Sequence, residues 1–111
     1  MLIDKEGDQV GDIEVLANLN TTTTQLFVDD FAIGEDGTAW IATHPNQVVR
    51  VAPDGTQLVI ANASLLLNPT SAALGRGSRE QEKILYVTDG GEFLATGLVD
   101  EGVVALDTTQ F

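Results

Sequence analysis

Short apolar runs separated by turn residues dominate the chain between positions 28 and 61. Glycine, proline and aspartate gather between the runs, and the Asp36-Gly37 pair can supply the positive φ of a tight turn. Strands joined by turns at this spacing are typical of antiparallel sheets and argue against helices. The pattern predicts four β-strands, at Phe31–Ile33, Ala39–Thr43, Val48–Val51 and Leu58–Ala61.

The strand interiors are nearly continuous apolar runs rather than an alternation of apolar and polar residues. Such runs indicate a sheet that is buried on both faces. In a β-propeller each four-stranded blade lies between two neighbouring blades, which produces this burial. The chain is therefore predicted to be all-β, with Val28–Ala61 as one complete antiparallel blade of a propeller.

A second copy of the pattern follows about 40 to 46 residues later, a period typical of propeller blades. Its strands are predicted at Thr70–Leu74, Leu85–Thr88 and Gly102–Leu106, and Tyr86 occupies the place of Trp40 in the first copy. Insertions fall in the turns at positions 75–83 and 90–101. No fourth strand is evident before Phe111, so residues 69–111 are interpreted as an incomplete following blade.

Residues 1–17 are interpreted as the end of a preceding blade. Leu2-Ile3 and Ile13–Ala17 are predicted to form a hairpin around a polar loop. The total is two to two and a half blades, whereas closed propellers need about four to eight. Three hypotheses follow for the chain: it is part of a larger propeller, it is a truncated product, or it is a subunit that completes the ring as a homo-oligomer. In each, further blades would cover the apolar faces of the terminal units.

Composition narrows the possible partners. The chain has 111 residues, no cysteine and a formal net charge of −12. Such a surface repels phosphate backbones and anionic lipids, so nucleic acids and membranes are not expected partners. The start, Met-Leu-Ile-Asp-Lys-Glu, lacks the features of a signal peptide, although sequons at Asn20 and Asn62 leave secretion open. The compartment is not predicted.

Strand direction alternates within a blade, so the predicted loops sort onto two ends. The first strand begins at Asp29 and Asp30, and the second strand returns to the same end at His44. By the same alternation, Ser71 and Asp89 belong to that end. The topology therefore predicts these five residues around one mouth, with residues 34–37 and 76–82 at the other.

Each candidate has a functional and a plain interpretation. Asp29 is a candidate metal ligand or general base, or an aspartate that caps a strand through an Asx-turn. His44 is a candidate proton carrier, or part of a polar His-Pro-Asn turn. Asp30, Ser71 and Asp89 are candidate substrate contacts. Ser71 is not predicted to be a nucleophile, because no G-x-S-x-G elbow surrounds it.

The order of several segments resembles the SMP-30/gluconolactonase-like family of six-bladed, TolB-like propellers. The segments are Val28–Ile33, Asp36–Ala42, Val48–Gly55, Pro69–Ser71 and Leu85–Thr88. The resemblance covers most of the chain from Val28 onward and implies the C-terminal portion of a six-bladed propeller. Each segment is generic for β-structure, and the order and spacing carry the likeness.

The resemblance implies a divalent metal, calcium above all, held on the ring axis by a glutamate, an asparagine and an aspartate. A gapless match places Asp29 at the aspartate, with Val28 and Asp30 where the family has proline and glycine. The other two ligands have no counterpart in this chain. The implied function is metal-dependent hydrolysis of lactones or small esters, in small-molecule biosynthesis for some members. The alternative is a non-catalytic propeller segment or binding scaffold.

Overall fold

The structure is a computed structural model that describes residues 2–19, 27–61 and 65–111. Nine strands and two short 3-10 helices are defined in these ranges. They are β1 (Phe27–Ile33), β2 (Ala39–His44), β3 (Gln47–Val51), β4 (Gln57–Ala61), β5 (Pro69–Leu74), η1 (Gln81–Lys83), β6 (Ile84–Asp89), β7 (Glu92–Leu94), β8 (Gly97–Val99), β9 (Gly102–Asp107) and η2 (Thr108–Gln110).

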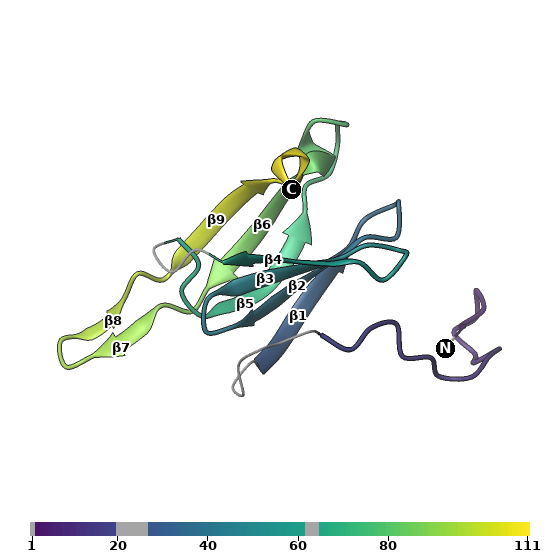
Figure 1. Cartoon of the computed structure of the whole chain (residues 1–111), viewed down its shortest axis with the longest axis horizontal. Helices are drawn as coiled ribbons and strands as arrows, with labels where there is room; N and C mark the ends of the chain where they lie inside the picture. Colours follow the sequence, from purple (N-terminus) through teal and green to yellow (C-terminus); the bar gives the residue numbers. More distant parts are fainter. Residues whose placement is uncertain (1, 20–26, 62–64) are drawn as a thin grey trace.

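The strands form a four-stranded sheet in the order β1-β2-β3-β4 and a three-stranded sheet in the order β5-β6-β9. A hairpin of β7 and β8 projects beyond the second sheet (Figure 1). Every pairing between the strands is antiparallel. The prediction of an all-β chain built from antiparallel sheets is therefore confirmed.

The turns of the first sheet follow the sequence signals. Gly37 and Gly55 have φ angles of 83° and 89°, as expected for the two Asp-Gly turns. Strands β2, β3 and β4 each lie within a residue of their predicted bounds. The first strand was predicted too short, because β1 begins at Phe27 and includes both aspartates. A β-bulge between Val28 and Phe31 shifts the register with β2, so the two aspartates lie in β1 at an interruption of the ladder.

The two sheets pack face to face, with β1 and β2 against β5. Residues paired across antiparallel strands share a face, so the register places Trp40, Val48 and Ile60 on the side that meets the second sheet. The second sheet contributes Ala72, Leu85 and Val87, and Leu66 fills the space between them. The main hydrophobic cluster of the described chain lies at this interface.

The apolar runs predicted that the first sheet is buried on both faces. This prediction is wrong for its outer strands, β1 and β4. Phe31 and Ile33 on β1 and Val59 on β4 remain exposed on the face turned away from the second sheet. Val49 and Val51 on the same face are buried. The apolar pattern therefore marks a surface that the described residues cover only in part.

The second sheet follows the predicted strands, with β5, β6 and β9 close to their expected positions. The insertion at 75–83 ends in η1, and the insertion at 90–101 forms the β7–β8 hairpin. After β9 the chain enters η2 instead of a fourth strand, and the Asp107 carboxylate accepts a hydrogen bond from the Thr109 amide. The second sheet thus has three strands in the described chain.

The N-terminal segment differs from its prediction. Residues 11–19 form no strand, and the segment's one bridge joins Ile3 to Gln9. Asp4 closes the loop by accepting hydrogen bonds from the amides of Glu6 and Asp8. A strand needs a ladder partner, and the expected second strand at Ile13–Ala17 has none among the described residues. In those same ranges, no helix has the length and apolarity to cross a bilayer.

We expect the interface between the sheets to carry most of the stability. Leu85 is fully buried there, whereas Ile13 is exposed in the N-terminal segment. Leu85→Ala should lower the free energy of unfolding by about 2–5 kcal/mol, because it removes buried methyl groups and leaves a cavity. Ile13→Ala should change it by less than about 0.5 kcal/mol. Urea unfolding followed by circular dichroism measures both, and equal effects would contradict this assignment of the core.

Candidate functional site

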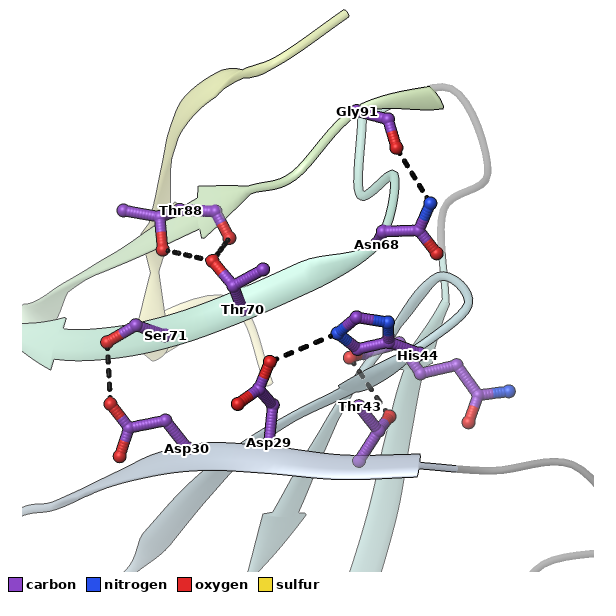
Figure 2. Close-up of polar contacts among 10 residues, drawn as sticks. Asp29, Asp30, Thr43, His44, Asn68, Thr70, Ser71, Thr88 and Gly91 are labelled. Atoms are coloured by element: carbon purple, nitrogen blue, oxygen red, sulfur yellow. Dashed lines mark hydrogen bonds and ion pairs between the residues drawn. The ribbon is translucent and has the colours of Figure 1, made fainter. Parts of the chain in front are cut away.

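The candidate site lies at the end of the sheets where β1 and β5 begin and β2 and β6 finish (Figure 2). Antiparallel pairing dictates this arrangement, because Phe27 pairs with His44 and Pro69 pairs with Asp89. The packing of β1 against β5 then brings the two strand ends together. All five residues singled out from the sequence lie at this end.

Asp29 and His44 form the first contact. The Oδ2 atom of Asp29 lies 3.2 Å from Nε2 of His44, and both side chains are partly exposed. A neutral imidazole protonated at Nε2 donates a hydrogen bond here, and a protonated imidazole makes an ion pair. The bulge in β1 and the turn after β2 therefore produce a carboxylate–imidazole pair that water can reach.

Asp30 and Ser71 form the second contact, between the two sheets. The Ser71 hydroxyl donates to Asp30 Oδ2 at 2.7 Å, and the Phe31 amide donates to Oδ1 at 2.8 Å. The hydrogen bond from Ser71, followed by the one from Phe31, lowers the pKa of Asp30 below its ordinary value. The Asp30 carboxylate is thus held in its ionised form at the junction of β1 and β5.

Asp89 has a different environment from the other two aspartates. It is buried at the end of β6, where its carboxylate accepts a hydrogen bond from the Leu67 amide. Its Oδ1 atom has no hydrogen-bond partner among the described residues. Burial raises the pKa of Asp89, because the charged form loses hydration. Asp89 shares the end of the sheets with the other candidates but makes no hydrogen bond to them.

Two further features of this end were not singled out from the sequence. The hydroxyls of Thr70 and Thr88 lie 2.8 Å apart across β5 and β6. Asn68, with a φ of 53°, donates from Nδ2 to the Gly91 carbonyl at 2.7 Å. The Asn68-Pro69 dipeptide is a turn signal that could have indicated the second feature. Nothing in the sequence pattern indicates that the two threonines meet.

Each sheet carries a bulge in the ladder between its first two strands. The bulge lies between Val28 and Phe31 on β1, and between Pro69 and Ser71 on β5. Aligning the two ladders by register makes Asp29 equivalent to Thr70, and Asp30 equivalent to Ser71. The hydrogen bond between Asp30 and Ser71 therefore joins equivalent positions of the two sheets. The repeat extends from the strands to the polar residues at their ends.

The described residues do not by themselves fit calcium. Within ranges 2–19, 27–61 and 65–111, no group of three or more histidine, cysteine or acidic residues could hold a metal. One carboxylate oxygen of Asp29 faces His44, and both oxygens of Asp30 accept hydrogen bonds. Calcium takes about six to eight oxygen ligands. A calcium role for Asp29 stays a prediction that needs ligands beyond these residues.

A cleft lies between the sheets at the opposite end from the candidate site. Its volume is about 730 Å³, and Ala32, Trp40 and Leu74 form part of its wall. Charged side chains of both signs line its rim, among them Asp36 and Arg76. None of the five candidate residues lines it. The cleft and the five candidate residues therefore lie at different places on the described surface.

No protein-family model matches the chain, and a search of curated proteins finds no match.

Asp89→Asn should stabilise the protein at neutral pH but not in acid. The raised pKa of Asp89 means that its ionised form costs stability above the ordinary carboxyl pKa of about 3.9, and that this cost disappears as the group is protonated in acid. We expect the variant to gain thermal stability over the parent at pH 7 and to lose that advantage near pH 4. Thermal melts of both proteins at the two pH values measure this. A constant difference would contradict the assignment.

Proposed function

We propose that the two sheets are neighbouring blades of a β-propeller. The direction in which the two sheets stack supports this proposal. The face of the first sheet that carries Trp40 meets the second sheet, and the equivalent face of the second sheet, which carries Tyr86, points away from the first. The sheets are thus stacked in one direction, as blades are, rather than around a two-fold axis.

We further propose hydrolysis of small esters or lactones at the Asp29–His44 pair. The observation that supports it is the 3.2 Å contact between Asp29 Oδ2 and His44 Nε2. The carboxylate orients the ring by accepting a hydrogen bond from Nε2. The Nδ1 atom of His44 makes no hydrogen bond to the described residues and is the nitrogen left to act on water.

The chemistry requires one proton to move twice. His44 Nδ1 takes a proton from water as the water oxygen bonds to the carbonyl carbon of the ester. The bond from that carbon to the alkoxide oxygen then breaks, and His44 returns the proton to the leaving oxygen. The products are a carboxylic acid and an alcohol, joined in one molecule when the substrate is a lactone. Asp30 and Ser71 provide oxygen atoms at the same end of the sheets for contacts with a hydroxylated substrate, whereas Asp89 is buried.

Replacing either member of the pair should abolish most of this activity. His44→Gln and Asp29→Asn should each lower kcat for a γ- or δ-lactone by about 10²–10⁴-fold, the usual contribution of a positioned acid–base group. Glu14→Gln is the matched control, because Glu14 is exposed in the N-terminal segment and lines neither the candidate site nor the cleft, so it should leave kcat unchanged. Lactone hydrolysis followed by pH-stat measures all three.

The same assay separates this proposal from its competitors. Turnover that persists in EDTA supports the pair as the base, whereas turnover that depends on added calcium supports the metal-dependent reaction implied by the family resemblance. Parent protein without turnover would contradict hydrolysis. That outcome would favour a binding scaffold, a candidate supported by the separation of the 730 Å³ cleft from the Asp29–His44 pair.

A further inference from the structure

Each sheet leaves much of one apolar face exposed; on the first sheet the outer strands are exposed, whereas Val49 and Val51 on the same face are buried. On the first sheet, the leading face consists of exposed side chains turned away from the second sheet: Val28, Phe31, Ile33 and Val59. On the second sheet, the trailing face lies on the side turned away from the first: Ala73, Tyr86, Val103 and Ala105. The molecule thus ends in an apolar sheet face on both sides.

The repeat shows what each face packs against when it is covered. Val103 on the trailing face is 64% exposed, whereas its equivalent in the first sheet, Val48, is 0% exposed because it faces the second sheet. Phe31 on the leading face is 56% exposed, whereas its equivalent Ala72 is 7% exposed against the first sheet. The existing interface therefore joins a face of the trailing type to a face of the leading type.

The distribution of charge also favours contact between the two faces. The formal net charge is −12, yet the residues that define the two faces are all uncharged. By register, Asp107 lies on the same side of β9 as Val103 and Ala105, at the edge of the trailing face, and it accepts hydrogen bonds from Thr109. Depletion of charge at the centre of such surfaces is typical of interface cores. Two faces with these properties are suited to contact with each other.

We infer that the leading face of one molecule binds the trailing face of a second copy of this chain, and that the copies close into a ring. The contact would repeat the interface that already joins the two sheets within the chain. Each copy contributes two sheets to the stack, so two to four copies would give the roughly four to eight blades of closed propellers. The ring rests on the proposed propeller architecture but not on the proposed hydrolysis.

The contact joins different surfaces, so the two faces can be blocked separately. Val103→Lys places a charge on the trailing face, and Phe31→Lys places one on the leading face; both side chains are exposed, so the fold should tolerate them. Phe93→Lys is the matched control, because Phe93 is 85% exposed on the β7–β8 hairpin, away from both faces. Circular dichroism and thermal melts check that each variant is folded.

Light scattering coupled to size exclusion measures the mass of each sample at several concentrations. We expect one oligomer of two to four copies for the parent and for Phe93→Lys. Val103→Lys alone and Phe31→Lys alone should be monomers, and their equimolar mixture should form a 1:1 dimer through the one unblocked pair of faces. This mixing result is not expected for a symmetric dimer in which like faces meet.

Three results would overturn the inference. A folded parent monomer would show that a second copy does not cover the faces and would favour blades supplied by another segment of protein. A mass that rises continuously with concentration would show an open polymer instead of a ring. A single-face variant that still dimerises would show contact between like faces. None of these readings depends on lactone turnover, so the inference and the proposed hydrolysis can fail separately.

Discussion

The packing of the first sheet against the second is the interaction on which the rest of the structure depends. Trp40, Val48 and Ile60 on one side and Ala72, Leu85 and Val87 on the other form the hydrophobic core of the described chain. A sheet that buries one face against another of the same kind gains most of its stability from that contact. The interface also fixes the distance and direction between β1 and β5, and hence every polar contact between the sheets.

The candidate site is a consequence of this packing. Asp29 meets His44 within the first sheet, through the antiparallel ladder and its bulge. Asp30 meets Ser71 only because β1 lies beside β5. The neighbouring aspartates consequently differ: Asp29 faces an ionisable ring, whereas hydrogen bonds lower the pKa of Asp30. A one-residue bulge thus separates the two side chains into different chemical environments.

The sequence predicted the site well where pairing is local and poorly where it depends on packing. Alternation of strand direction was enough to place Asp29, Asp30, His44, Ser71 and Asp89 at one end. It could not predict which of them touch, that Asp89 is buried with an unpartnered oxygen, or that Thr70 meets Thr88. These contacts depend on side-chain rotamers and on the separation of two sheets, which no spacing along the chain encodes.

By itself, the sequence determined the all-β class, the positions of the turns and most strands, and the repeat of about 40 residues, because glycine turns and apolar runs act over a few neighbouring residues. Tertiary structure decided the rest. The segment at Ile13–Ala17 has an apolar content suited to a strand but no ladder partner within the described ranges, and Phe31 and Val103 have core-like side chains that remain exposed. An apolar pattern records which surfaces are suited to burial; whether they are buried depends on what lies beside them.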